Sequence, residues 1–124
     1  MLYTMLIYET GADFSRRADP ATREAYLAEW PRYAQALRDA GIYVFGSGLQ
    51  PPDTATTLRF GGGEPQVQDG PFAETKEQLG GLIVLNLPDL DAALDWAARA
   101  PRYPGRVIEV RPNVPSPPNS VCAA

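Results

Sequence analysis

The chain has 124 residues, with 11 basic and 15 acidic side chains, a formal net charge of −4, one cysteine and no histidine. Its length and its 44% of hydrophobic residues predict a single domain with one core, and the acidic balance argues against a nucleic-acid-binding surface. The longest apolar run, Leu82 to Leu87, is too short for a membrane helix, and the N-terminus does not resemble a signal peptide. One cysteine excludes an internal disulfide. We therefore expect a cytoplasmic protein without a membrane partner.

The first third of the chain predicts a strand, a helix and a second strand. Leu2 to Tyr8 is apolar on both faces of an extended backbone. An amphipathic helix follows between Asp19, as its N-cap, and Gly41, at its C-terminal end, and Pro31 inside it is expected to kink or split it. Its apolar stripe consists of Tyr26, Trp30, Tyr33 and Leu37. Ile42 to Phe45 then predicts the second strand.

The middle of the chain predicts a β-hairpin. Ala55 to Phe60 and Gln66 to Asp69 flank the glycine-rich turn Gly61 to Glu64. A charged stretch, Ala73 to Gln78, precedes the next strand, Leu82 to Leu87, which is apolar on both faces.

The last part of the chain predicts a helix, a strand and a tail. Asp89 is a credible N-cap for a helix that Pro101 ends, and Val107 to Arg111 predicts the final strand. Residues 1–112 therefore form one expected domain, and residues 113–124 are expected to be a proline-rich, flexible C-terminal tail.

This order of elements predicts an α+β domain with a ferredoxin-like βαββαβ arrangement and an inserted β-hairpin. Two helices cover only one face of such a sheet, although the first and fifth strands are apolar on both faces. A second copy packed sheet against sheet would cover the other face, so we expect a homodimer.

The segment from Asp69 to Phe72, Asp-Gly-Pro-Phe, ends a strand at a sharp turn. In a structural interpretation, Asp69 accepts backbone N–H bonds within the turn and Phe72 fills the core. In a functional interpretation, Asp69 stands beside a cleft and binds a ligand or moves a proton. The two are compatible, and in the second the ligand site would also include Glu74, Lys76 and Glu77.

Glu109 and Arg111 lie on one face of the last predicted strand. They predict an ion pair at the surface or at an interface, with anion binding by Arg111 as the alternative. Without histidine there is no imidazole base, and no phosphate loop, dinucleotide fingerprint or set of metal-spaced ligands is present. We therefore expect neither a metal nor a cofactor.

One continuous block resembles a known family. The run from Gln68 to Gly81, QDGPFAETKEQLGG, is followed by PDLDAALDWAARAP and VIEVRP and preceded by LYTMLIYE and GLQPP. Together they resemble the DGPF branch of the YCII-related family, over residues 1 to about 114. The resemblance implies a dimeric α+β barrel of ferredoxin-like subunits.

The broader family resembles enzymes that carry a His–Asp pair, with the histidine early in the first helix. Here that stretch holds Trp30, Pro31 and Tyr33, and only Asp69 matches the acidic half. Many members of the branch resemble products of genes beside extracytoplasmic-function sigma factors, which implies a regulatory or stress-linked role.

Three hypotheses for the function follow. The first is a dimer that binds a small molecule, with or without lyase- or isomerase-like chemistry, in which Asp69 is the acid/base or the anchor and Lys76 or Arg111 orients an anionic substrate. The second is a non-enzymatic accessory protein in sigma-factor-linked regulation, and the third is a purely structural dimer.

Overall fold

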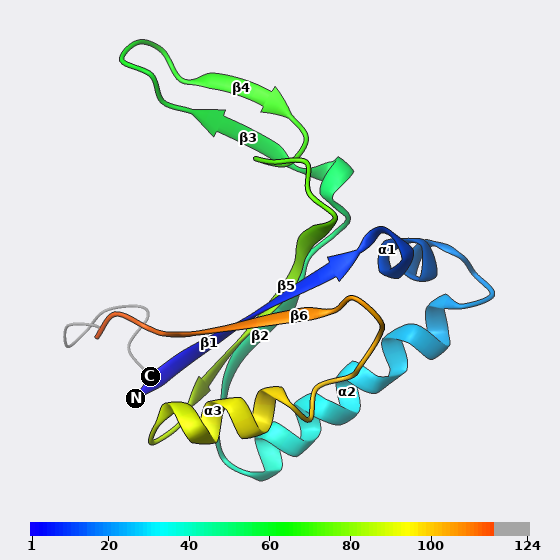
Figure 1. Cartoon of the computed structure of the whole chain (residues 1–124), viewed down its shortest axis with the longest axis vertical. Coiled ribbons are helices and arrows are strands. Elements are labelled where there is room, and N and C mark those ends of the chain that lie inside the picture. The colour runs from blue at the N-terminus through cyan, green and yellow to red at the C-terminus, as the bar shows by residue number, and fades with distance from the viewer. Residues whose placement is uncertain (116–124) are drawn as a thin grey trace.

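A four-stranded antiparallel sheet forms the centre of the computed structural model, which describes residues 1–115. Its strands are β1 (Leu2–Thr10), β2 (Tyr43–Gly48), β5 (Glu77–Asn86) and β6 (Val107–Pro112), in the order β2-β5-β1-β6. Every neighbouring pair is antiparallel. The predicted α+β class is confirmed, and the strand order is compatible with the ferredoxin-like arrangement (Figure 1).

Two helices cover one face of this sheet, namely α2 (Arg23–Asp39) and α3 (Leu90–Ala97) (Figure 1). Asp89 caps α3 as predicted, because its side chain accepts a hydrogen bond of 2.9 Å from the backbone N–H of Ala92. Of the two effects expected at Pro31, a kink or a split, the split is wrong, because the proline lies inside one uninterrupted helix.

Sequence reasoning missed the helix α1 (Gly11–Ala18), which follows β1 directly. Thr10 and Asp13 form a capping box at its start, and this pattern is visible in the sequence. β1 runs two residues beyond the predicted strand, so α1 and its cap lie in the segment that the sequence predicts as a connection.

Buried and partly exposed residues alternate strictly along β1, and this pattern shows which side of the sheet faces the core. Every second residue from Tyr3 to Glu9 is buried on the helix-covered side of the sheet. The core is completed by residues of the other strands and helices, chiefly Tyr33, Leu37, Ile83, Leu85, Leu87 and Ala93. Burial of these side chains is the main driving force for the packing of the helices on the sheet.

The other face of the sheet carries apolar residues that none of the helices within residues 1–115 covers (Figure 1). Leu6 faces Leu82 across the β1–β5 pair, and both are only partly buried. Phe45, which is paired with Val84, remains 55% exposed. The expectation that this sheet is apolar on both faces is therefore met, and we call this second side the open face.

The predicted hairpin is present and stands apart from the main sheet (Figure 1). Its strands, β3 (Thr56–Arg59) and β4 (Gln66–Asp69), form a separate two-stranded sheet next to the short 3₁₀ helix η1 (Pro52–Thr54). We call residues 56–69 the arm. Phe72, which follows the arm, is 73% exposed, so the prediction that it fills the core is wrong.

Two boundaries in the second half also differ from the prediction. β5 begins at Glu77 rather than at Leu82, because the end of the charged stretch pairs with Glu9 and Thr10 of β1. Asn113 donates a backbone hydrogen bond of 2.8 Å to the carbonyl of Leu2, so pairing with β1 continues one residue past β6. The structure describes the predicted tail only as far as residue 115, so residues 116–124 lie outside the described part.

Among the described residues, no helix is both long and apolar enough to span a bilayer.

Candidate functional site

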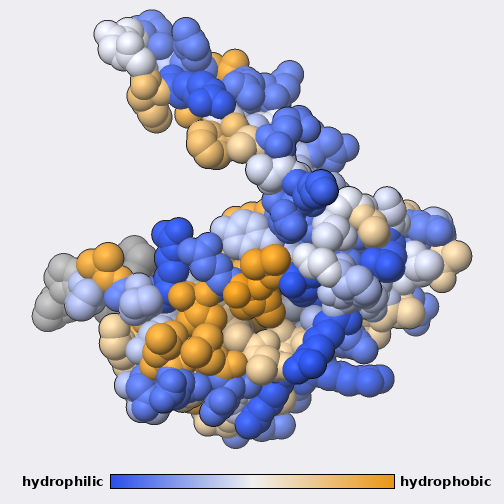
Figure 2. Space-filling model, viewed as in Figure 1, coloured by the Kyte–Doolittle hydropathy of each residue, from blue (hydrophilic) through white to orange (hydrophobic). Residues whose placement is uncertain are grey.

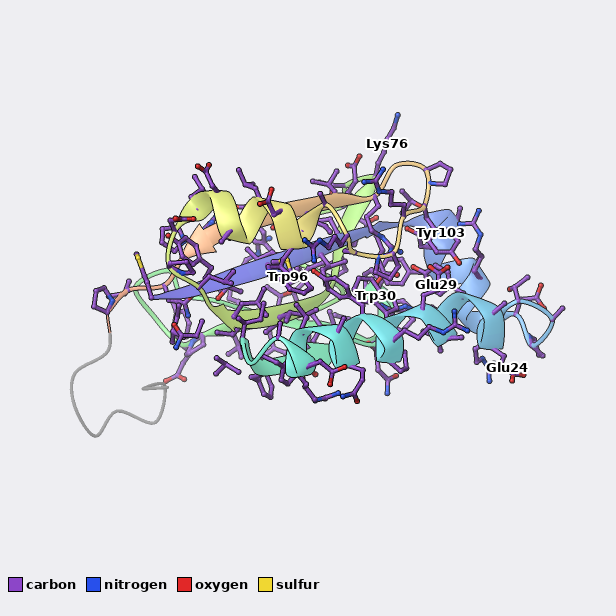
Figure 3. All side chains as sticks on the ribbon, turned by 90° about the horizontal axis from the view of Figure 1, so that it is seen from below. Glu24, Glu29, Trp30, Lys76, Trp96 and Tyr103 are labelled. Atoms are coloured by element: carbon purple, nitrogen blue, oxygen red, sulfur yellow. The ribbon has the colours of Figure 1, made fainter. Side chains whose placement is uncertain are left out.

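A cavity of about 630 Å³ lies between α2 and the strands β2 and β5. Its helix wall is largely apolar and is formed by Leu27, Trp30, Pro31 and Ala34. Figure 3, which looks onto the helices, shows Trp30 in the layer between α2 and α3. The strand wall contains four residues without side chains, Gly46, Gly48, Gly80 and Gly81. A concave, mostly apolar space of this volume is typical of small-molecule sites.

Glu9, which is buried, and Arg17, which is partly exposed, form an ion pair in the wall of this cavity. Nη2 of Arg17 lies 2.5 Å from Oε1 of Glu9, and Nε of Arg17 donates to Oε2 over 3.2 Å. The hydroxyl of Tyr26 donates a third hydrogen bond to Oε2, over 2.6 Å. Glu9 is only 3% exposed, because it occupies the inward phase of β1. Its charge is thus compensated by three hydrogen bonds, two from the Arg17 guanidinium and one from Tyr26.

A β-bulge in β5 makes room for this pair. The register steps from Ile7–Gly81 to Tyr8–Leu79, so Gly80 is the extra residue of the bulge. Its carbonyl accepts hydrogen bonds from the backbone N–H of Leu49 over 2.8 Å and from Nη2 of Arg17 over 2.9 Å. A Cβ atom at position 80 would lie 2.1 Å from Oε1 of Glu9. The carboxylate of Glu9 therefore occupies the space that any other residue would need at this position.

A second arginine, Arg106, has a buried side chain and binds the hydroxyl of Tyr26. Nη2 of Arg106 donates to the hydroxyl of Tyr26 and lies 3.7 Å from Oδ2 of Asp13, which is fully buried. The guanidinium also sits over three aromatic rings, at 5.2 to 5.6 Å from the centroids of Tyr26, Trp30 and Tyr103. Arg106, Tyr26, Glu9 and Arg17 thus form one continuous polar chain from the interior to the cavity.

This chain of polar side chains keeps the hydroxyl of Tyr26 protonated. Burial, and then the hydrogen bond to the Glu9 carboxylate, raise the pKa of Tyr26 far above its ordinary value near 10, and the nearby Arg106 only partly opposes this. Tyr26 therefore remains a hydrogen-bond donor to Glu9 throughout the neutral range. In chemical terms the arrangement holds a carboxylate rigidly at the edge of an apolar cavity.

The site residues predicted from the sequence lie in other parts of the molecule. Asp69 is exposed at the end of the arm strand β4 and is not among the residues that line the 630 Å³ cavity. Glu74 is also exposed. Lys76 and Glu77 line a broader hollow of about 900 Å³ beside α1, and Lys76 extends away from the body of the molecule (Figure 3).

Arg111 lies at the opposite end of the sheet from Glu77. It pairs with Thr4 of β1, whereas Glu77 pairs with Thr10, so the two are separated by roughly 20 Å along the strand. The predicted ion pair is present: Nε of Arg111 lies 2.5 Å from Oε2 of Glu109. This bond, with a weaker one from the Tyr8 hydroxyl, holds the pKa of Glu109 below its usual range. The structure does not gather Arg111 and Glu77 into one site.

Part of the missed site was visible in the sequence. Glu9 continues the inward phase of Tyr3, Met5 and Ile7, so a carboxylate was in line with core positions. The pair Gly80-Gly81 within a strand is likewise a known sign of a bulge or of a close approach. No local pattern indicates Arg106, whose partners lie about 80 and 93 positions earlier in the chain.

The described residues contain no group of three His, Cys, Asp or Glu side chains arranged to hold a metal ion.

The fold and the cavity define an α+β domain with a buried glutamate at the edge of an apolar pocket. The family model of the YCII-related domain matches residues 1–115. A protein of Rhizobium meliloti (strain 1021), itself described as uncharacterized, is 37% identical over 100 residues, which cover 78% of this chain and 77% of that protein. The chain belongs to the YCII-related family.

Proposed function

We propose that the protein binds a small, largely apolar molecule in the cavity between α2, β2 and β5, with the Glu9–Arg17 pair at its polar edge. The observation that carries this proposal is the buried carboxylate of Glu9 in the cavity wall. A buried ion pair is costly to desolvate and contributes little net stability, so its position beside an open space favours a role in recognition.

The geometry favours binding over proton transfer. Acid–base chemistry requires a carboxyl group that can exchange its proton with the ligand. Three donors already engage the Glu9 carboxylate, so it is a fixed polar group at the edge of the cavity and is poorly placed to abstract a proton. Asp69, the residue that the sequence suggested for acid–base work, stands on the arm. Any lyase- or isomerase-like role for Asp69 would need a site outside this cavity.

The test uses a neutral fluorescent probe, N-phenyl-1-naphthylamine, and amide NMR spectra of the protein. We expect the probe to shift the resonances of the cavity glycines Gly46, Gly48, Gly80 and Gly81 in a saturable way. Replacing Gly48 by leucine should weaken this binding at least tenfold, because a Cβ at this position meets no atom within 4 Å and the side chain would fill the cavity.

The matched control is Gly63→Leu, in the exposed turn of the arm, where an added Cβ also meets no atom within 4 Å. This variant should bind the probe like the wild type. Shifts confined to open-face residues such as Leu6 and Leu82, or equal binding by Gly48→Leu, would contradict the proposal.

We also propose that the open face is covered by a second copy of the chain. The support is the partly exposed apolar surface on this side of the sheet, including Phe45. A stable dimer needs about 1,200 to 2,000 Å² of buried surface, which a four-stranded sheet face can supply. Sedimentation should give twice the chain mass of 13.5 kDa. Phe45→Glu should shift the equilibrium to monomer, whereas Leu90→Glu, on the helix side, should not.

A stable monomer of the wild-type protein at micromolar concentration would refute this assembly. The space-filling view shows that hydrophobic residues also gather over β6 and α3 (Figure 2). Leu90, Leu94 and Val107 are each close to half exposed there. If Leu90→Glu dissociates the dimer and Phe45→Glu does not, this second patch is the interface instead.

A further inference from the structure

The cavity has two unlike walls that face each other across the proposed ligand. On α2, Trp30 contributes a flat aromatic surface. On the strand side, the backbone at Gly48 is uncovered, because an added Cβ there meets no atom within 4 Å, whereas Tyr43 lies over Gly46 and Glu9 lies over Gly80. Aromatic rings and peptide groups both stack well on flat π-systems, whereas a bulky saturated ligand contacts such walls less completely. The shape therefore selects a planar body.

The charges that line the cavity do not balance. Glu9 and Arg17 neutralise each other within the 2.5 Å ion pair. The remaining charged residue in the lining is Arg38, in the last turn of α2. It takes part in none of the ion pairs found among residues 1–115. The cavity thus carries an excess of one positive charge.

The guanidinium of Arg38 is held in place by an aromatic ring. It lies 4.5 Å from the ring centroid of Tyr43, at the start of β2, and Tyr43 also lines the cavity. Stacking on the ring leaves the in-plane N–H groups of the guanidinium free to meet an oxyanion. An arginine fixed in this way is suited to bind a carboxylate in two-point geometry.

We infer that the ligand class of this cavity is a planar apolar monoanion, typified by an aromatic carboxylate, whose ring lies between Trp30 and the uncovered backbone at Gly48 and whose carboxylate meets Arg38. This inference rests on the proposed function and deepens it. A dianion or a phosphate ester fits less well, because Arg17 already binds Glu9, Leu49 and Gly80, and Arg38 is then the single cation of the lining that forms no ion pair within residues 1–115.

The experiment compares three probes of similar size: 2-naphthoate, its neutral analogue 2-naphthamide, and the saturated decalin-2-carboxylate. Binding is followed by the amide resonances of the cavity glycines and by calorimetry at low salt. We expect 2-naphthoate to bind at least tenfold more tightly than either of the other two. The preference for the acid over the amide should shrink as salt is added, because Arg38 is solvent-exposed.

Two arginine variants locate the charge effect. Arg38→Gln should bring 2-naphthoate and 2-naphthamide to within twofold of each other. Arg32→Gln is the matched control, since Arg32 is an exposed arginine of the same helix and does not line the cavity. It should retain the full preference for the acid.

The possible failures are distinguishable. Equal affinity for acid and amide in the wild type, or a preference that survives in Arg38→Gln, overturns the assignment of charge. Equal affinity for naphthoate and decalin carboxylate overturns the assignment of a planar body. Binding of N-phenyl-1-naphthylamine to the cavity without binding of any of the three probes overturns the ligand class and leaves the proposed function standing. Absence of all binding at the cavity glycines overturns both.

Discussion

Replacing Gly80 by alanine tests the central contact of the candidate site. A Cβ atom at position 80 would lie 2.1 Å from Oε1, 2.6 Å from Cδ and 2.9 Å from Cγ of Glu9. A flexible side chain normally relieves such a clash by changing its rotamer, at little cost in free energy. Glu9 cannot do so freely, because Arg17 and Tyr26 hold its carboxylate and it is only 3% exposed.

The expected cost follows from the bonds that must break. Displacing the carboxylate removes its hydrogen bonds to Arg17 and Tyr26, and a hydrogen bond to a charged group contributes about 1.5–3 kcal/mol. Alanine recovers roughly 0.5–1 kcal/mol by restricting the unfolded backbone. Because three such bonds are affected, we expect the free energy of unfolding to fall by at least about 3 kcal/mol, equivalent to a decrease in Tm of at least roughly 10 °C.

The assay is urea unfolding at one fixed protein concentration, so that any association contributes equally to every variant. Gly48→Ala is the control, because its Cβ meets no atom within 4 Å, and it should be as stable as the wild type or slightly more so. In a Glu9→Ala background, Gly80→Ala should cost nothing further, since the clashing side chain is gone. A stability of Gly80→Ala within 0.5 kcal/mol of wild type, or an equal cost in both backgrounds, would refute the reasoning.

Burial raises the pKa of Tyr33 to about 12 and that of Tyr26 still further, whereas both groups have a pKa near 10 in the unfolded chain. The stability that these protonated groups contribute should therefore be complete below pH 10 and decline as the pH rises toward 12. Urea unfolding at pH 8 to 11.5 checks this, and a flat profile would contradict it. Arg111→Gln should move the pKa of Glu109 upward, since Arg111 is the main cause of its depression; carboxyl NMR titration measures the shift, with an unchanged pKa as the negative result. Asp69→Asn should leave both the Tm and the binding of 2-naphthoate at the cavity unchanged, because Asp69 is exposed on the arm, and loss of binding would return Asp69 to the site.

Periodicity in the sequence was sufficient for most of the fold. Alternation in β1, the apolar stripe of α2 and the Asp89 cap of α3 are each local signals with a direct physical cause, and the structure shows all three. The hairpin was equally clear, since its glycine-rich turn lies between two extended runs. The misses at α1 and at the start of β5 lie where polar residues are ordered by pairing or capping rather than by apolar periodicity.

The candidate site was harder to predict, because it depends on contacts between distant segments. The sequence drew attention to Asp69, which ends a conspicuous turn motif. The buried cluster instead joins residues from β1, α1, α2 and the loop before β6. Glu9 alone had a local signal, through its phase in the strand. The roles of Arg17 and Arg106 appear only when the chain is folded.

The position of the cluster links the cost of the ion pair to the shape of the cavity. An apolar pair of similar volume in place of Glu9 and Arg17 would avoid the desolvation penalty and could be at least as stable. Such a pair would not tie the carbonyls of Leu49 and Gly80 together, as Arg17 does. These two carbonyls belong to the segments that bound one side of the cavity. The ion pair therefore contributes to the shape and the polarity of the cavity rather than to stability alone, and this is the physical reason for placing the proposed binding site at this end of the sheet.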